Sequence, residues 1–232
     1  MGVSREQAAE NRRAIVAAAE RLFRERGVDA VGLAELMKAA GFTQGGFYNH
    51  FKSKDALVAA MMDKALEEGR ETIAGVIDQA QASGADAIEQ HIRSYLSSEH
   101  RANIDAGCPL SGFAGDARRL DDEARVAYAQ GLATHLERLT EVIEAREAGR
   151  ARSEPAGRRE SSRGKAIALF SQMLGTLVLS RAVVDVAPAL ADEILDEGCR
   201  QLLDATGAQQ AGSGRPGGRG KQQPSASKPK SA

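Results

Sequence analysis

The sequence of 232 residues contains no tryptophan, few aromatic residues (4 %) and only two cysteines. Scarce aromatics argue against β-sandwiches and barrels, whose strands favour these side chains. Cys108 and Cys199 are too few and too far apart for a disulfide framework or a metal cluster, and they indicate a reducing compartment. The first residues are charged, and no apolar segment of a secretion signal follows them. We therefore expect a cytoplasmic protein.

The patterns that mark membrane spans and enzyme sites are also missing. The most apolar run, residues 166–180, is shorter than the roughly 20 residues that a membrane span needs. The four histidines form no H-E-x-x-H pattern, and His91 and His135 are expected to be solvated on helix surfaces. Residues 212–217 satisfy G-x-G-x-x-G, but Pro216 interrupts the motif and no predicted strand precedes it. The sequence predicts no enzyme, no cofactor, no metal site and no membrane partner.

What the sequence does contain is a helical pattern along most of its length. Apolar residues recur every three to four positions, and alanine, leucine, glutamate and arginine, all common in helices, dominate the composition. This pattern predicts an all-α fold of about nine helices. They are a first helix ending at Gly27, then helices over 33–41, 43–51, 53–82 and 86–96, a short one from Pro109, and helices over 122–143, 165–186 and 188–207. The charged stretch 149–164 contains Pro155 and Gly157 and is predicted to be a loop.

Charge is unevenly distributed and suggests three parts. Residues 1–54 carry nine Lys/Arg against six Asp/Glu, residues 55–206 carry 17 against 26, and residues 207–232 carry five basic residues and no acid. A polyanion would be attracted to the two ends and repelled by the middle. We predict a DNA-binding domain over 1–54, a helical effector-binding and dimerisation domain over 55–207, and a basic disordered tail over 208–232.

The segment from Val31 to Leu57 has the pattern of a helix-turn-helix. Gly41 suits the tight turn between two short helices, and Thr43 is placed to cap the second one. Phe42 and Phe47 have the spacing of a hydrophobic staple. If Phe47 and Phe51 face inward, the outward residues can read base edges or contact phosphates. The predicted DNA contacts are Thr43, Gln44, Gly45, Tyr48, Asn49, His50, Lys52 and Lys54. The alternative is a helical hairpin whose aromatics are simply core.

Residues 47–55, with the sequence Phe-Tyr-Asn-His-Phe-Lys-Ser-Lys-Asp, resemble the signature of the TetR family of bacterial transcriptional regulators. The apolar pattern of the two preceding helices is also similar, so the strong match covers about residues 9–62. This resemblance implies a homodimeric repressor that places two recognition helices in successive major grooves of a pseudo-palindromic operator. The pair Gly45-Gly46 within the recognition helix departs from a stable helix, because each Gly costs about 1 kcal/mol relative to Ala.

The resemblance further implies that the last two helices pair with those of a second copy in a four-helix bundle. The helix over 165–186 is apolar nearly all round, so it must be covered on several sides, either by a partner or as the central core of one chain. The predicted dimer contacts are Phe170, Met173, Leu174, Leu177 and Leu195.

A small-molecule effector is the other partner that the resemblance implies, in a pocket among the middle helices. The candidate lining residues are Tyr95, Cys108, Leu110, Phe113, Tyr128, Met173 and Leu177, although most residues of these types in such positions are ordinary core. Cys108 precedes a helix, whose amide dipoles can lower a thiol pKa. The pair Gly107-Cys108 resembles a TetR subgroup with Gly-Cys at this point, and some members of that subgroup respond to oxidants or electrophiles through such a thiol. The alternative is that Cys108 is a small buried hydrophobe.

Two other interpretations of the whole chain stay open. A constitutive DNA-architecture or dimerisation module would have the same helix-turn-helix but no cavity for a ligand. Ligand cavities in proteins have volumes of roughly 300–1,000 Å³. A helical enzyme would need clustered titratable groups in such a cavity, and the sequence does not indicate them. The basic tail is either an inert solubilising end or an arm that adds salt-sensitive phosphate contacts.

Overall fold

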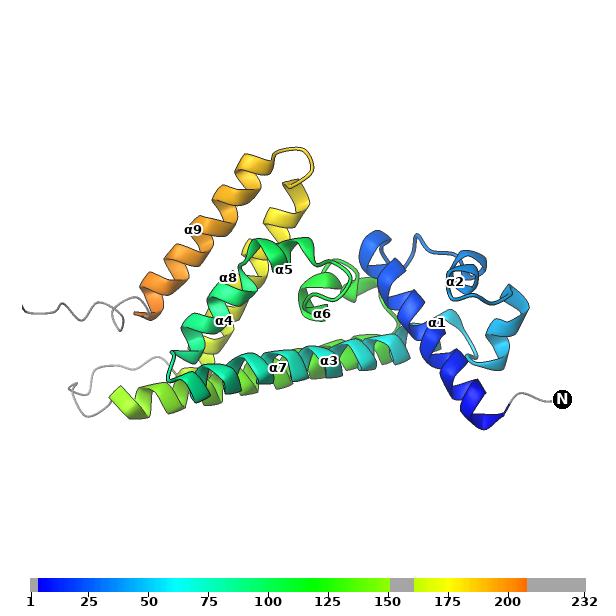
Figure 1. Ribbon diagram of the computed structural model, residues 1–232, viewed down its shortest axis with the longest axis horizontal. Coiled ribbons are helices and arrows are strands. Elements are labelled where there is room, and N and C mark those ends of the chain that lie inside the picture. The colour runs from blue at the N-terminus through cyan, green and yellow to red at the C-terminus, as the bar shows by residue number, and fades with distance from the viewer. Residues whose placement is uncertain (1–3, 151–160, 208–232) are drawn as a thin grey trace, which may run out of the picture.

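The computed structural model describes residues 4–150 and 161–207, and these residues form an all-helical fold without strands. The elements are α1 (Arg5–Arg26), α2 (Leu33–Ala39), the 3-10 helix η1 (Gln44–Asn49), α3 (Lys54–Ser83), α4 (Ala87–Tyr95), α5 (Ser98–Ala102), α6 (Pro109–Gly112), the 3-10 helix η2 (Ala117–Arg119), α7 (Asp122–Arg150), α8 (Ser162–Val183) and α9 (Pro188–Thr206). Figure 1 shows α1 and α2 at one end of an elongated molecule, α3 and α7 side by side along it, and α8 with α9 at the other end.

Side-chain caps fix the helix boundaries that the sequence indicated. The Ser53 hydroxyl accepts a hydrogen bond from the Ala56 amide at 3.0 Å and starts α3. The Asp86 carboxylate accepts from the amides of Ile88 and Glu89 and starts α4. Such caps satisfy amides that have no partner within the helix, and each stabilises its helix by about 1 kcal/mol. The all-α prediction is confirmed, and most boundaries lie within a few residues of those expected.

Three local features differ from the expected helices. The recognition segment is a 3-10 helix over Gln44–Asn49, which suits the low helix propensity of its two adjacent glycines. A short helix, α5, begins after Ser97, whose hydroxyl caps it by accepting from the His100 amide at 3.1 Å. The third is η2 over Ala117–Arg119. The last two are too short for apolar periodicity to reveal. The basic tail 208–232 and most of the predicted loop 149–164 lie outside the described residues.

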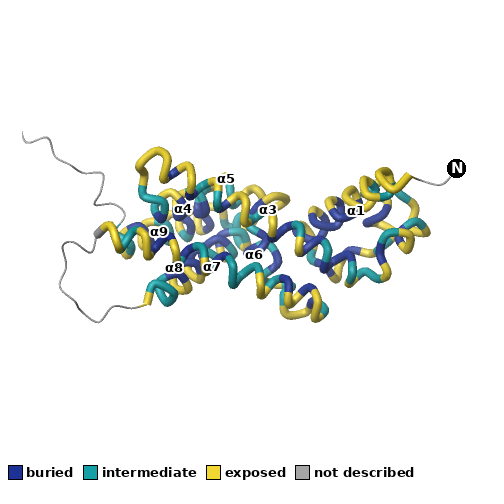
Figure 2. Tube along the Cα trace, turned by 90° about the horizontal axis from the view of Figure 1, so that it is seen from below, coloured by how far each residue is buried: buried dark blue, intermediate teal, exposed yellow. Residues whose placement is uncertain are grey.

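One continuous hydrophobic core runs through the described chain. The first half of α3 packs Leu57, Val58, Met61 and Met62 against the N-terminal helices, and its second half packs Ile73 and Ile77 toward α4 and α7. In Figure 2 buried stretches, in dark blue, occur along the helices from α1 to α9 and alternate with intermediate and exposed ones. Because α3 belongs to both ends of this core, a shift along α3 would move the N-terminal helices relative to the body.

The apolar helix α8 packs on α9 and α7 through one face only. Phe170, Met173, Leu177 and Leu195 are at most 4 % exposed, so these four predicted dimer contacts lie inside the chain and not on its surface. Only Leu174 of that set remains half-exposed. The helix spans 22 residues and is therefore longer than its most apolar run indicated. By length and composition alone it could cross a membrane, a test that core helices also pass.

Candidate nucleic-acid interface and internal cavity

The turn between α2 and η1 depends on Gly41 and on two inward phenylalanines. Gly41 has φ +83°, a conformation that residues with a Cβ rarely adopt, and its amide donates to the Lys38 carbonyl at 3.1 Å. Phe47 is fully buried and stacks on Phe51 with ring centroids 5.8 Å apart. These contacts hold η1 against the core by its inner side. Thr43 occupies the N-cap position as expected, although its hydroxyl makes no capping hydrogen bond there.

The outer side of η1 exposes the residues that the helix-turn-helix interpretation requires. Gln44, Gly45, Tyr48 and Asn49 are all exposed, and Tyr48 is the most prominent, at 67 %. The Tyr48 ring contacts the buried Phe47 ring edge to face at 5.3 Å between centroids, so the core supports one side of an otherwise exposed ring. An exposed amide pair on a supported segment can donate to and accept from base edges.

The basic residues after η1 divide into two groups. Lys52 is exposed and His50 is half-buried, so both can reach a phosphate. Lys54 is different, because its ammonium donates to the carbonyls of Val28 and Val31, each at 2.7 Å. Lys54 therefore ties the loop between α1 and α2 to the start of α3, and we do not retain it as a DNA contact. Among the basic residues near η1, the sequence analysis did not single out Arg12. It is exposed, and its guanidinium lies over the Phe51 ring at 4.5 Å.

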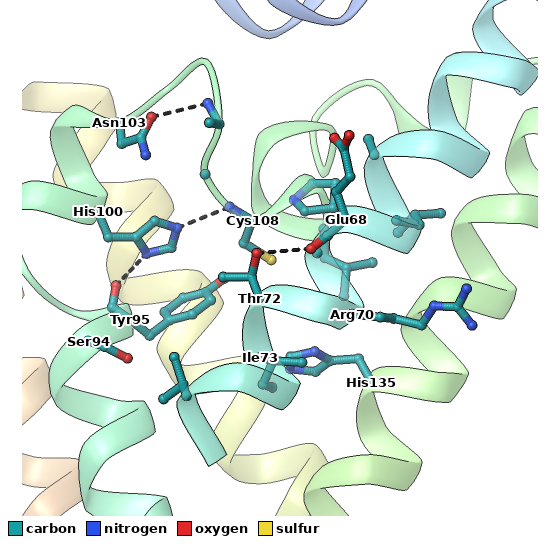
Figure 3. A pocket seen from close by; sticks show the side chains of 18 of the residues that line it. Glu68, Arg70, Thr72, Ile73, Ser94, Tyr95, His100, Asn103, Cys108 and His135 are labelled. Atoms are coloured by element: carbon teal, nitrogen blue, oxygen red, sulfur yellow. Dashed lines mark hydrogen bonds between the residues drawn. The ribbon is translucent and has the colours of Figure 1, made fainter. Parts of the chain in front are cut away.

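A cavity of about 600 Å³ lies between the end of α1, α3, α4, α7 and the segment that joins α5 to α6 (Figure 3). Its volume is in the range of small-molecule sites. Of the predicted lining residues, the structure brings Tyr95, Cys108 and Leu110 to its wall. Phe113, Tyr128, Met173 and Leu177 are not among the lining residues. Met173 and Leu177 belong to the core between helices, and the Tyr128 hydroxyl donates to the Leu110 carbonyl at 2.7 Å.

The expectation that His91 and His135 are solvated was wrong. They are 4 % and 8 % exposed, line the cavity from α4 and α7, and have ring centroids 6.0 Å apart. Burial, and then the neighbouring His135 and His100, lowers the pKa of His91 to about 3. Burial lowers the pKa of His135 to about 4. Both are neutral at pH 7. Each lies in a helix with mixed polar neighbours, so the sequence does not show which face meets the core.

His100 and Cys108 form the rim of the cavity nearest α5 (Figure 3). The His100 ring bonds the Tyr95 carbonyl through Nδ1 at 2.7 Å and accepts from the Cys108 amide through Nε2 at 3.0 Å. These two bonds require a neutral ring with the proton on Nδ1. The helix that follows Cys108, α6, has only four residues, so its macrodipole is small.

Arg24 connects this rim to the N-terminal helices. Its guanidinium donates to the Gly107 carbonyl at 2.9 Å and pairs with the Glu20 carboxylate at 2.8 Å. Lys64 on α3 also pairs with Glu20, at 3.0 Å. The Arg24 side chain is 2 % exposed and lies over the Phe113 ring. This buried network joins α1, α3 and the residue before Cys108.

Arg181 on α8 holds the same segment from the opposite side. Its guanidinium donates to the carbonyls of His100, Arg101 and Asn103. Arg101 in turn pairs with Asp192 on α9 at 2.7 Å. Helix α5 and Asn103, the first residue after it, are therefore linked to the last two helices, and Gly107 further along is linked to α1.

Comparison with known proteins identifies the N-terminal part. Residues 15–61 match the family model described as bacterial regulatory proteins, tetR family. The chain is 24 % identical over 135 residues to the HTH-type transcriptional repressor NemR of Escherichia coli, an alignment that covers 58 % of this chain and 68 % of NemR. It is 44 % identical over 64 residues to the HTH-type transcriptional regulator TtgR of Pseudomonas putida, covering 28 % of this chain and 30 % of TtgR.

Solved structures extend the likeness to the body of the molecule. The reduced form of E. coli NemR superposes with a TM-score of 0.68 at 19 % identity, covering 84 % of this chain and 97 % of that one. A TetR transcriptional regulator from Chloroflexus aurantiacus gives a TM-score of 0.68 at 22 % identity, covering 87 % and 96 %. At these identities the superpositions establish the fold alone. Residues 15–61 therefore form a DNA-binding domain of the tetR family, and the body has the fold of TetR-family structures.

Proposed function

We propose that the protein is a cytoplasmic repressor and not an enzyme, and that it binds a pseudo-palindromic operator as a homodimer until a small molecule or modification of Cys108 releases it. The observation that carries this proposal is the arrangement of α1, α2 and η1, which we call the reading head. In η1 the side chains of Gln44, Tyr48 and Asn49 are exposed, and the buried Phe47 holds the segment against the core. Gln and Asn pair bidentately with adenine, and Thr43, His50 and Lys52 supply phosphate contacts. Gly45, also exposed, lets the backbone lie close to the duplex.

The open face of α8 supports a dimer. Ile167 and Leu179 are 45 % and 59 % exposed, and a Cβ at Gly175 between them would meet nothing within 4 Å beyond the helix itself. Leu190 on α9 is 46 % exposed on the neighbouring helix. A monomer gains nothing from exposed apolar side chains around a mid-helix glycine, whereas a second copy would cover them and could approach closely at Gly175. We therefore replace the four buried residues predicted from sequence with this surface, and retain Leu174.

The cavity supports release by a ligand. It is large enough for a small molecule and is bounded by residues that connect through Arg24 to α1. A ligand that favours a different spacing of the two reading heads by several kcal/mol would empty the operator. A module without an effector would not need a chamber of this size next to that connection.

Cys108 is the second proposed trigger, because its half-buried thiol belongs to the cavity wall and its backbone is held by His100. Oxidation or alkylation there would add bulk at the rim. The relative NemR has been described in a reduced form, which makes redox state a sensible variable to test. If Cys108→Ser leaves release from DNA by oxidants and aldehydes unchanged, this trigger is excluded.

The decisive experiment is selection of bound duplexes from a random pool, using the full chain. We expect a palindrome whose half-sites lie about 34–36 Å apart, one helical turn. Gln44→Ala should cost about 1–3 kcal/mol and relax the preference at one base position. The matched control is Gln79→Ala, an exposed glutamine on α3 far from η1. A monomeric protein with no preference for any duplex would overturn the proposal.

A further inference from the structure

Three buried polar atoms on the inner wall of the cavity have no hydrogen-bond partner within the protein. They are the Nε2 atoms of His91 and His135 and the hydroxyl of Tyr95. All three residues line the cavity and are at most 8 % exposed. Leaving a buried donor or acceptor unpaired costs about 1–3 kcal/mol per group. Three such atoms around one chamber indicate that the wall is built to bind a polar occupant.

The same side chains present flat surfaces. The rings of His91 and Tyr95 lie 5.8 Å apart, and His135 lies 4.0 Å from Phe170, which packs behind it. Tyr95 also contacts Phe170, at 6.0 Å. Aromatic side chains at these separations favour stacked or edge-to-face contacts with another ring. We call the three lining residues His91, Tyr95 and His135 the ring wall, which Phe170 supports from behind.

The charges around the cavity disfavour an ionic ligand. Neutral histidines offer an anion no counter-charge, and burial keeps the pKa of both well below 7. The cations that line the cavity are engaged, since Arg24 and Lys64 pair with Glu20, and Arg70 pairs with Glu67. A cationic ligand would need a carboxylate beside the rings, but Glu20 and Glu68 pair with Lys64. The other two lining carboxylates, those of Glu99 and Asp105, belong to exposed residues. Desolvating an unpaired charge in such a site is costly.

We infer that the effector is an uncharged, planar ring compound carrying a hydroxyl or carbonyl group, which stacks on the ring wall and hydrogen-bonds to Tyr95, His91 and His135. This inference rests on the proposed function, because it specifies the ligand of the same cavity. A neutral imidazole and a phenol can each donate or accept, so the wall accommodates a hydroxyl or a carbonyl oxygen. Selectivity arises because a ligand without the polar group leaves those atoms unpaired.

The test uses four probes of one shape, namely 2-naphthol, naphthalene, 2-naphthoate and 2-naphthylmethylammonium, and measures their binding to the full chain by calorimetry near pH 7 without DNA. At this pH the first two are uncharged, the third is an anion and the fourth is a cation. We expect 2-naphthol to bind at least about tenfold more tightly than each of the others, the factor that one hydrogen bond of about 1.4 kcal/mol supplies.

Two matched variants locate the effect. Tyr95→Phe removes only the unpaired hydroxyl, and should weaken 2-naphthol about tenfold while leaving naphthalene unchanged. Tyr128 does not line the cavity, and its hydroxyl already donates to the Leu110 carbonyl, so Tyr128→Phe should change neither affinity. His91→Phe provides a second test, because it keeps a ring in the wall but removes its hydrogen-bonding atom.

Equal or tighter binding of the anion or the cation would overturn the inference. An affinity for 2-naphthol that Tyr95→Phe does not alter would also overturn it. If none of the four probes binds, the inference is overturned as well, and water is the sole partner of the wall. The ligand-free chain is assayed separately for operator binding. Loss of the probe preference with operator binding intact refutes the ligand class alone, whereas absent operator binding with the preference intact refutes the proposed function.

Discussion

The Arg24 guanidinium on α1 donates a 2.9 Å hydrogen bond to the carbonyl of Gly107, the residue that precedes Cys108. It joins a helix of the reading head to the wall of the cavity across 83 positions of sequence. Because Arg24 also pairs with the buried Glu20, it has no room to move independently of α1. A ligand that displaces the segment around Gly107 must either break this bond or move α1.

Arg24→Lys should make the effector less able to release the protein from its operator, while the affinity for the operator is preserved. A lysine keeps the charge beside Glu20 but lacks the planar fork that reaches both Glu20 and Gly107. We expect operator affinity within about threefold of the parent and a release midpoint raised at least about tenfold in effector or oxidant concentration. The control is Arg21→Lys, an exposed residue on the same helix that pairs with Glu25. An identical release curve for both variants would show that this bond carries no coupling.

Two tyrosine-to-phenylalanine changes should alter stability in opposite directions. Tyr95→Phe removes a buried hydroxyl that has no partner, and should raise the free energy of unfolding of the ligand-free protein by about 1 kcal/mol. Tyr128→Phe removes the bond to the Leu110 carbonyl and should lower it by about 1 kcal/mol. Urea unfolding measures both. A destabilising Tyr95→Phe would mean that this hydroxyl has a partner in solution.

Stability should fall as the pH drops below about 6.5, the ordinary pKa of histidine. The folded chain keeps His91 and His135 neutral, because burial lowers their pKa values to about 3 and about 4. The unfolded chain takes up protons first, so each histidine removes about 1.4 kcal/mol per pH unit from about pH 6.5 down to its folded pKa. Unfolding at several pH values should show this slope, and the double variant His91→Phe/His135→Phe should lose most of it. Tyr95→Phe should retain it.

A charge on the open face of α8 should break the dimer. Leu179→Glu places a carboxylate among the apolar residues that we expect a second copy to cover, and burying it there costs several kcal/mol. Val126→Glu is the control, since Val126 on α7 is 55 % exposed, close to the 59 % of Leu179. Sedimentation should give a monomer for the first variant and a dimer for the second. Two dimers would place the interface elsewhere.

The paired glycines of η1 should respond differently to alanine. Neither has positive φ, and a Cβ at Gly45 meets nothing within 4 Å, so each Gly→Ala change should stabilise the segment by up to about 1 kcal/mol. Gly45 is exposed on the outer side, where an added methyl would separate the backbone from the duplex. We therefore expect Gly45→Ala to weaken operator binding at least about tenfold and Gly46→Ala to preserve it, as measured by titration of labelled DNA.

The sequence predicted the parts of the fold that depend on local patterns. Ser53, Asp86 and Gly41 act through bonds or backbone angles within a few residues of themselves, so their capping and turning roles could be recognised in advance. The inward and outward sides of η1 followed from the spacing of Phe47 and Phe51. The 3-10 geometry did not, because the choice between helix types depends on packing as well as propensity.

The cavity and the dimer surface depend on contacts between distant segments. His91 and His135 meet across α4 and α7, and nothing near either residue in the sequence indicates that they share a wall. The side of α8 that faces α7 and α9 could not be chosen from a helix that is apolar nearly all round. Four of the five predicted dimer contacts therefore proved to belong to the core of one chain.

Two arginines donate to the segment between α5 and α6, Arg24 from α1 to the Gly107 carbonyl and Arg181 from α8 to the Asn103 carbonyl. Arg24 belongs to a helix of the DNA-binding part, and Arg181 belongs to α8, the helix whose open face is proposed to meet a second copy. Any event that displaces this segment would therefore act on α1 and α8 together. A single small perturbation could then change how each head is tilted and how far apart the two heads stand.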